Sequence, residues 1–300
     1  YFENVQELGY ATNLTLTPTR IGAPRCYWNP IYKIDESMSL EDAILGSRLH
    51  LLDSVRIRLR SDVPLAFCLS GGVDSASLVS IAAKEFDAKL ETFSIIDSDK
   101  RYNEEDNIMA TARDVERPYH LFEIPKQRAL SRLRDLIAYH DVPIATITYY
   151  VHSLISEAVH NAGFKVVFSG TSADELFSGY YDHFLLHLNE VRGAPDYQTY
   201  ITDWTKHTAT FIRNPILKIA NLFCDNPDFR EHIFDASKEL NDYLTVDFKE
   251  KYSEKEFGVN LMRNRMLNEL FHEITPVALH EDDLNSMRYS VENRSPYLDR

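Results

Sequence analysis

The chain has 300 residues, with 32 Lys and Arg against 46 Asp and Glu, so its formal net charge is −14. Hydrophobic residues make up 44% and aromatic residues 12%, which supplies a sizeable core and excludes an intrinsically disordered chain. The acidic balance argues against nucleic acid or an anionic membrane as the main partner, and no apolar run approaches the roughly 20 residues of a membrane helix.

The three cysteines, Cys26, Cys68 and Cys224, are widely spaced and odd in number. They form neither a metal-binding Cys-x-x-Cys pair nor a disulfide framework, so we expect reduced thiols in a cytoplasmic protein. The chain begins at Tyr1 and ends at Arg300. We expect a fragment of a longer protein, truncated at its C-terminus.

Residues 1–35 alternate short apolar and turn segments, which predicts short strands and connectors without a core of their own. A helix is predicted from about Ser39 to Arg60, with Ser39 as its N-cap and one apolar stripe directed to the core. The stripe consists of Leu45, Leu49, Leu52 and Val55.

Apolar runs and amphipathic helical patterns alternate in the next part of the chain. Strands are predicted at 65–69, 90–96, 119–124 and 164–168, and helices at about 75–86, 103–115 and 151–161. This alternation predicts an α/β fold, a parallel sheet with flanking helices, over about 60–185. Helical patterns replace the strand pattern afterwards, so we predict a helical C-terminal extension over about 186–300.

A glycine loop follows the first of these strands. It reads Ser70-Gly71-Gly72-Val73-Asp74-Ser75. Adjacent glycines let backbone N–H groups approach an anion, and the next helix directs its free N–H groups and positive dipole end to the same point. The two serines add hydroxyl donors, and Asp74 offers a carboxylate to a magnesium ion. No lysine follows until Lys84, so this is not a Walker loop; the alternative is a plain turn between strand and helix.

A second glycine loop follows the strand at 164–168 and reads Ser169-Gly170-Thr171-Ser172-Ala173-Asp174. Ligands of open α/β sheets lie at the carboxyl ends of the strands, so this loop is expected to face the first. Asp174 is then a candidate second magnesium ligand opposite Asp74. Alternatively, Asp174 and Glu175 only favour the start of a helix.

A third segment, 279–299, carries charged residues before Pro296. Glu292 and Arg294 are candidates for polar groups that project into a cleft, and an ordinary ion pair is the alternative. We predict that Glu281-Asp282-Asp283 is a solvated charge run, with a position near the mouth of a site as the alternative. Histidines such as His152 lack the four-residue spacing of zinc ligands on a helix and are expected to be satisfied or exposed.

In this order, the three segments resemble the synthetase domain of the asparagine synthetase family, within the N-type ATP pyrophosphatase superfamily. The resemblance extends from about Tyr27 to Asp299 and implies an adenine nucleotide alpha hydrolase-like fold. It also implies that 1–35 is a connector from an N-terminal glutaminase domain absent from this chain, and that 36–300 is the synthetase domain.

The resemblance implies an ATP- and magnesium-dependent ligase. A substrate carboxylate, by family default that of aspartate, attacks the α-phosphate, and ammonia from glutamine then displaces AMP; a homodimer is one assembly to expect. The implied catalytic residues are Asp74, Asp174, Thr171, Glu292 and Arg294. The implied nucleotide-binding residues are Leu69, Ser70, Gly71, Gly72, Asp74, Ser75, Ile95, Ser169 and Gly170, and the implied metal ligands are Asp74 and Asp174.

The chain departs from the family pattern at three positions. Thr171 replaces a usual acid, Ser172 replaces a usual glycine, and Leu284 stands where a Lys or Arg is common. A threonine cannot act as a carboxylate base. The same strings resemble a branch linked to bacterial surface-polysaccharide synthesis, which implies a sugar uronic acid as the alternative acceptor. A nucleotide-binding module without turnover is the alternative from another class; a tRNA-modifying enzyme is disfavoured by the charge and by the lack of a catalytic cysteine pair.

Overall fold

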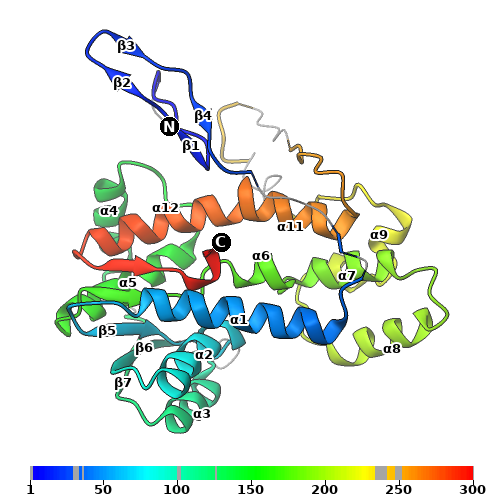
Figure 1. Ribbon diagram of the computed structural model, residues 1–300, viewed down its shortest axis with the longest axis horizontal. Helices are drawn as coiled ribbons and strands as arrows, with labels where there is room; N and C mark the ends of the chain where they lie inside the picture. The colour runs from blue at the N-terminus through cyan, green and yellow to red at the C-terminus, as the bar shows by residue number, and fades with distance from the viewer. Residues whose placement is uncertain are drawn as a thin grey trace. The chain divides into compact units, whose positions relative to one another are not determined.

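The computed structural model describes residues 3–29, 34–35, 37–99, 103–125, 127–233, 242–246 and 252–299. The chain forms two compact units (Figure 1). The first comprises 1–172 and 275–300, and the second comprises 173–274. The sequence predicted a boundary near residue 185 between an α/β part and a helical part of the synthetase domain. That boundary stays a prediction.

The first unit contains a five-stranded sheet in which every described pair of neighbours is parallel. Its order is β7-β6-β5-β8-β9, and its strands are β5 (Leu65–Cys68), β6 (Leu90–Ile96), β7 (Tyr119–Glu123), β8 (Val166–Phe168) and β9 (Glu292–Arg294). The central strands read as continuous apolar runs because both faces of a parallel sheet are covered. The predicted α/β fold, a parallel sheet with flanking helices, is confirmed.

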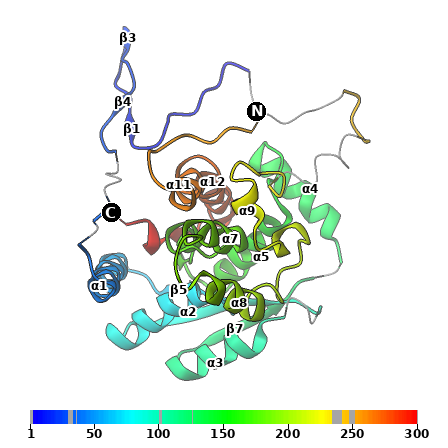
Figure 2. The same cartoon turned by 90° about the vertical axis from the view of Figure 1, so that its right-hand side faces the viewer.

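Helices cover both faces of this sheet. The connections from β5 to β6 and from β6 to β7 run toward one edge of the sheet. The connection from β7 to β8 runs back toward the other edge. Because such crossovers are right-handed, the two groups of connecting helices lie on opposite faces. Figure 2 shows the first group on one side of the sheet and the second group on the other. The first group is α2 (Val73–Ser80), a π-helical turn (Ile81–Glu85) and α3 (Glu105–Val115); the second is α4 (Ala129–His140) and α5 (Ile147–Asn161).

The strand β9 corrects the sequence interpretation, which expected only helix from 186 to 300. Its residues pair with β8, with Glu292 opposite Val166 and Arg294 opposite Phe168. A polar segment without apolar alternation carries no strand pattern of its own. The ladder to β8 determines its conformation.

The core of the first unit lies on both faces of the sheet. Phe67 and Phe168 stack across neighbouring strands with ring centroids 4.3 Å apart, an arrangement that aromatic pairs favour. One cluster of buried side chains contains Ala66, Phe93, Val159, Phe164, Val167 and Val291. This packing fixes the carboxyl ends of β5 and β8, where both glycine loops begin.

Helix α1 (Leu40–Arg58) begins after Ser39, whose hydroxyl accepts a hydrogen bond from the Asp42 N–H as predicted. The predicted core stripe is wrong for Leu45 and Leu49, which are each 56% exposed. Val55 is fully buried, and the neighbouring Ser54 hydroxyl donates to the Pro296 carbonyl at 2.5 Å. The helix therefore packs through its C-terminal turns.

The N-terminal segment of the first unit forms two short antiparallel pairs, β1 with β4 and β2 with β3. Their bounds are β1 (Thr12–Asn13), β2 (Leu16–Thr17), β3 (Arg20–Ile21) and β4 (Arg25–Cys26). Their described residues are mostly exposed. These short strands match the sequence expectation. That residues 1–35 are a connector from a glutaminase domain stays a prediction.

The second unit is helical in its described residues. Its helices are α6 (Ala173–Phe177), α7 (Tyr181–Glu190), α8 (Tyr197–His207), a 3-10 turn (Ile216–Lys218), α9 (Leu222–Asp225) and α11 (Leu261–Phe271). Its core consists of Leu185, Leu186, Leu188, Trp204, Ile212 and Phe223. Helix α12 (Ile274–Met287) and the 3-10 turn at Pro296–Leu298 belong to the first unit apart from Ile274.

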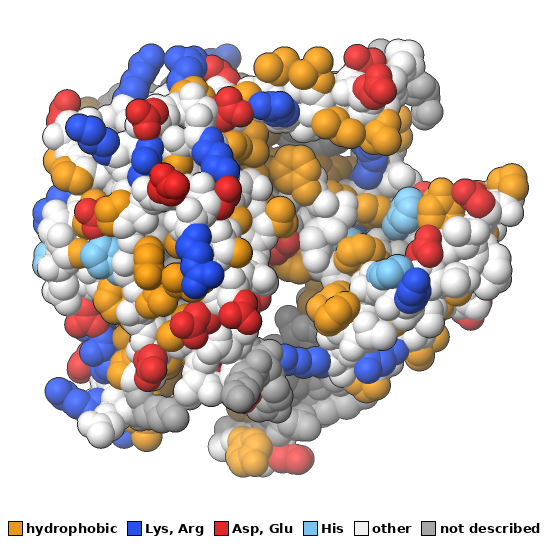
Figure 3. Space-filling view, turned by 90° about the horizontal axis from the view of Figure 1, so that it is seen from below, with side chains coloured by type: hydrophobic (Ala, Val, Ile, Leu, Met, Phe, Trp, Pro, Cys, Tyr) orange, Lys and Arg blue, Asp and Glu red, His pale blue; other side chains and the backbone are white. Residues whose placement is uncertain are grey.

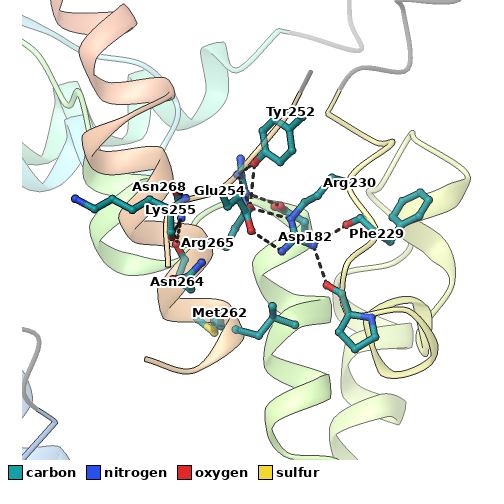
Figure 4. A network of polar contacts seen from close by, with 12 residues as sticks. Asp182, Phe229, Arg230, Tyr252, Glu254, Lys255, Met262, Asn264, Arg265 and Asn268 are labelled. Atoms are coloured by element: carbon teal, nitrogen blue, oxygen red, sulfur yellow. Dashed lines mark hydrogen bonds and ion pairs between the residues drawn. The ribbon is translucent and has the colours of Figure 1, made fainter. Parts of the chain in front are cut away.

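A buried polar network stabilises the second unit (Figure 4). The Arg265 guanidinium is 3% exposed and lies 3.0 Å from Glu254 and 3.0 Å from Glu269. Arg230 makes two hydrogen bonds to Glu254, at 2.8 and 2.7 Å. Buried carboxylates need such partners because isolated buried charges are costly, and hydrogen bonds from the arginines lower the pKa of Glu254 against the effect of burial.

Both signs of charge are mixed on the surface. In the view of Figure 3, the Lys and Arg side chains of the described residues lie interspersed with Asp and Glu side chains. Among the described helices, none is both long and apolar enough to cross a membrane.

Candidate active site

The first glycine loop connects β5 to α2 at the carboxyl edge of the sheet. Leu69 is 2% exposed, and its N–H donates to the Phe93 carbonyl of β6 at 3.0 Å. That bond extends the sheet by one residue before the chain leaves it. Helix α2 begins at Val73 with Gly72 as its cap residue. The N-terminus of this helix therefore lies directly at the glycine loop, as the sequence predicted.

Hydroxyl groups hold this loop in shape. The Ser70 N–H donates to the Ser75 hydroxyl at 2.9 Å, and the two hydroxyl oxygens are 2.9 Å apart. The Gly72 N–H donates to the Ser70 hydroxyl at 3.2 Å. Each serine therefore orients the loop backbone in addition to any contact with a ligand.

The loop residues fit an anionic group. The Gly71 N–H donates to a carboxylate oxygen of Glu104 at 3.0 Å, so an anion already uses the donor that a phosphate oxygen would use. A Cβ atom on Gly71 would lie 2.4 Å from the Cβ of Glu104, which explains why this position requires glycine. Sequence reasoning missed Glu104, since nothing in its sequence context connects it to the loop.

The second glycine loop packs directly against the first. An ideal Cβ on Gly170 would lie 3.3 Å from the Cβ of Asp74 and 3.3 Å from the backbone nitrogen of Ser75. The structure thus brings Ser169-Gly170 together with the phosphate loop, as expected from two neighbouring parallel strands that end at the same edge. Glycine at 170 permits this close approach.

The third segment also reaches both loops. The Tyr297 hydroxyl donates to the Asp74 carbonyl at 3.0 Å, and burial together with the Asp74 charge raises the pKa of Tyr297 to about 12. The Ser169 N–H donates to the Arg294 carbonyl at 2.9 Å, and the hydroxyls of Ser169 and Ser295 are 3.4 Å apart. Sequence reasoning did not single out Tyr297 or Ser295; their place in the third segment was the available signal.

A chain of polar groups begins at Thr171. Its oxygen is 2.9 Å from the Ser169 hydroxyl, and its hydroxyl donates to a carboxylate oxygen of Asp282 at 3.0 Å. The other oxygen of Asp282 lies 2.9 Å from the Nδ1 atom of His152. Asp282 is only 8% exposed.

This arrangement corrects the prediction that residues 281–283 form a solvated charge run. Glu281 is 3% exposed, and one of its oxygens accepts a hydrogen bond from the Ala145 N–H at 3.2 Å. Of the three acids, only Asp283 is exposed. Consecutive helical residues point in directions about 100° apart, so three acids in a row cannot share one face.

Glu292 and Arg294 pair with each other, with the Arg294 Nε donating to Glu292 at 2.7 Å. The Arg294 guanidinium also donates to the carbonyls of Arg58 and Arg60 at the end of α1. These contacts fit the alternative prediction, in which the two residues form an ordinary ion pair. A catalytic role for either residue stays a prediction.

Ile95 is half-buried on β6 and packs against a cluster of Leu136, Tyr150 and Leu154. Its expected contact with adenine stays a prediction, as does that of Leu69. Leu284 is half-buried on α12 and provides no positive charge at the place where a Lys or Arg is common.

Asp174 lies in the second unit, on α6, so the sharing of one magnesium ion by Asp74 and Asp174 stays a prediction. Burial raises the pKa of Asp174, and the nearby His183 opposes that shift. A Cβ on Gly179 would overlap the Asp174 carboxylate. The glycine thus makes room for this side chain.

A second set of candidate metal ligands in this unit consists of Asp182, His183 and Glu269, whose ligand atoms lie within 4.8 Å of one another. The Arg265 Nε is 3.0 Å from Glu269 and 3.9 Å from Asp182. Because the guanidinium already supplies positive charge there, we assign this cluster a structural role.

Ser172 adopts φ = 72°, a left-handed conformation that glycine reaches at lower cost than other residues. Its buried hydroxyl is 2.8 Å from that of Thr275. The backbone thus explains why a glycine is usual here, and the hydrogen bond helps to offset the strain of serine.

Comparison with known proteins identifies the family. The family model described as asparagine synthase matches residues 47–300. Similar proteins include "Amidase chyE" from Penicillium rubens, 28% identical over 60% of this chain and 29% of that protein. "Putative asparagine synthetase [glutamine-hydrolyzing] 2" from Methanocaldococcus jannaschii is 34% identical over 55% of this chain and 31% of that protein.

"Asparagine synthetase [glutamine-hydrolyzing] 3" from Bacillus subtilis is 26% identical over 99% of this chain and 47% of that protein. The chain therefore spans less than half the length of these relatives. Among solved structures, the U34-tRNA thiolase NcsA from Methanococcus maripaludis aligns with a TM-score of 0.34 and 12% identity, over 85% of this chain and 82% of that chain. On the family match, which covers most of its length, this chain belongs to the asparagine synthase family.

Proposed function

We propose that this chain is the ATP-dependent, amide-forming part of a ligase. A carboxylate oxygen of the acceptor bonds to the α-phosphorus of ATP, and the bond from that phosphorus to the departing pyrophosphate breaks. The nitrogen of ammonia then bonds to the acyl carbon, AMP leaves, and one proton is released. The observation that carries this proposal is the close approach of Gly170 to the first loop, where a Cβ on Gly170 would lie 3.3 Å from the Asp74 Cβ and from the Ser75 backbone nitrogen, because it joins the two loops that the reaction requires.

The phosphate loop is suited to the pyrophosphate part of ATP. The N–H groups of Gly71 and Gly72 and the hydroxyls of Ser70 and Ser75 are its donors, and the N-terminus of α2 adds a favourable dipole. Preorganised donors of this kind stabilise the charge that develops on a leaving group. Here Glu104 supports the assignment, since its carboxylate accepts a hydrogen bond from the Gly71 N–H.

Asp74 is the proposed magnesium ligand of the first unit, and Asp174 is its proposed partner. When bound, a magnesium ion neutralises charge on the pyrophosphate as it departs. Leu69 and Ile95 are proposed to border the adenine, and Ser169 is proposed to contact the nucleotide from the second loop.

For the acceptor we propose aspartate, since relatives named asparagine synthetases match the chain. A sugar uronic acid is the second candidate, because Thr171 and Leu284 depart from the pattern of aspartate-using enzymes. Relatives named amidases also match, which widens the set of acceptors to test. We further propose a cytoplasmic location and ammonia delivered from glutamine by another part of the protein.

Pyrophosphate release tests the proposal. The complete protein is incubated with ATP, magnesium and ammonium, and with L-aspartate, uronic acids or nucleotide-linked uronic acids in turn. Release that depends on one acceptor supports the ligase and names its substrate. ATP binding without release for any carboxylate would favour the nucleotide-binding module, in line with the missing acid at Thr171 and the missing positive charge at Leu284.

A further inference from the structure

The chain of polar groups that begins at Thr171 leads from the two glycine loops to solvent. Ser169 and Thr171 flank Gly170, which contacts the phosphate loop. Asp282 accepts the Thr171 hydrogen bond, and His152, whose side chain is 41% exposed, lies on the far side of that carboxylate. Hydroxyl, carboxylate and imidazole groups in this order form a path for a proton.

Asp282 is one of the two buried acids of α12. Its side chain is 9% exposed, and both of its oxygens have polar partners. The groups that contact it are His152 from α5 and Thr171 from the second loop. Burial and the Asp282 charge together raise the pKa of Cys68, at the end of β5, to about 12.

The proposed reaction needs an acceptor for one proton. Ammonia that attacks an acyl-adenylate must lose a proton to become an amide, and a hydroxyl that donates to a carboxylate can accept that proton while giving up its own. Thr171 is the residue next to Gly170 with such a hydroxyl. Its lack of a carboxylate is therefore compensated by Asp282 within the same hydrogen-bond chain.

We propose that Asp282 is a positioning residue that acts through Thr171 to remove the proton released when ammonia becomes an amide. The attacking nitrogen gives its proton to the Thr171 oxygen, and the Thr171 proton passes to Asp282. From there the proton leaves to solvent beside the exposed His152 ring, whose Nδ1–H donates to the Asp282 carboxylate and stabilises its charge. This inference rests on the proposed function and adds residues to its second step.

The test measures the two steps separately in the complete protein. Adenylation is followed as acceptor-dependent exchange of labelled pyrophosphate into ATP, and the second step as amide formed with ammonium. We expect Asp282→Asn to retain pyrophosphate exchange and to lose amide formation by about a hundredfold or more, the usual contribution of a general base. Asp283→Asn is the matched control, because it makes the same change one residue away on an exposed position of the same helix.

Two readouts distinguish a proton path from a structural role. Compared with the unaltered protein at the same concentration of unprotonated ammonia, amide formation by Asp282→Asn should recover as pH rises, because hydroxide can then accept the proton. Hydroxylamine, which is largely unprotonated at neutral pH, should restore acyl transfer in the variant. A structural defect would show neither recovery.

A second variant covers the possibility that Asp282→Asn fails to fold. Thr171→Val removes the hydroxyl and keeps the side-chain shape, and it should show the same selective loss. Full amide formation at neutral pH in either variant, or equal loss of both steps in Thr171→Val, would overturn the inference alone. No pyrophosphate exchange with any acceptor in the unaltered protein would overturn the proposed function and this inference with it.

Discussion

The two glycine loops of the first unit follow neighbouring parallel strands, yet they are built differently. In the first, hydrogen bonds among backbone N–H groups and the hydroxyls of Ser70 and Ser75 hold the loop in shape, and all of these groups lie within six residues. In the second, Thr171 depends on Asp282, more than a hundred residues away in sequence. Local motifs identified both loops, but a motif does not reveal a distant side-chain partner such as Asp282.

The largest expected effect concerns Asp74 in the first loop. We expect Asp74→Asn to lower pyrophosphate release by about 10²–10³-fold, because loss of one charge-stabilising group in a preorganised site costs this much. Both steps should fall together, in contrast to the selective loss expected for Asp282→Asn. Pyrophosphate release is the measurement, with Asp62→Asn on an exposed loop as control; unchanged release would remove Asp74 from the mechanism.

The next effect tests whether the backbone of the first loop is essential. A Cβ on Gly71 would lie 2.4 Å from the Cβ of Glu104, so Gly71→Ala must displace the loop. We expect pyrophosphate release to fall by about tenfold to a hundredfold, since a shift of about 1 Å in a positioning element has effects of this size.

Gly46→Ala is the control for this glycine, because nothing lies within 4 Å of its would-be Cβ on α1. That variant should keep its activity and gain up to about 1 kcal/mol of stability from helix propensity. Normal activity in Gly71→Ala would contradict a role for close backbone approach.

A smaller effect is expected at Glu104, whose carboxylate competes with phosphate for the Gly71 N–H. Glu104→Gln should bind ATP up to about fivefold more tightly, because exposed charge contacts contribute about 1 kcal/mol or less. Calorimetric titration with ATP and magnesium measures the change, and Glu105→Gln is the exposed neighbour for comparison. Weaker binding in Glu104→Gln would instead assign this carboxylate to the nucleotide site.

The smallest effect tests the backbone of the second loop. Ser172→Ala keeps the strained φ of 72° and loses the hydrogen bond to Thr275. It should be less stable than Ser172→Gly by about 1 kcal/mol, as measured by urea unfolding. Ser47 is an exposed position within α1. There the order of stability should reverse, with Ser47→Ala more stable than Ser47→Gly by a similar amount.

Much of the sheet was predictable from sequence because its central strands are buried on both faces. The apolar runs 65–69, 90–96 and 119–124 correspond to β5, β6 and β7 within one residue. The polar β9 could not be found, since its pairing with β8 and not its composition makes it a strand. The stripe on α1 misled because a helix pattern does not tell which turns of the helix contact the core.

The candidate site was predictable as far as its motifs are local. The motifs identified both glycine loops, and the structure joins them at Gly170 and Asp74. They did not identify Asp282, because an acidic run on a helix does not reveal which member is buried. The contacts of Tyr297 with Asp74 and of Glu104 with Gly71 depend on tertiary packing in the same way.

The central claim is that the acceptor carboxylate forms its bond to the α-phosphorus of ATP. The most direct measurement uses an acceptor with both carboxylate oxygens labelled with 18O and follows the label in the products by mass spectrometry. We expect each AMP to carry one 18O atom and the amide to keep the other. AMP without label, or label in inorganic phosphate released together with ADP, would contradict it.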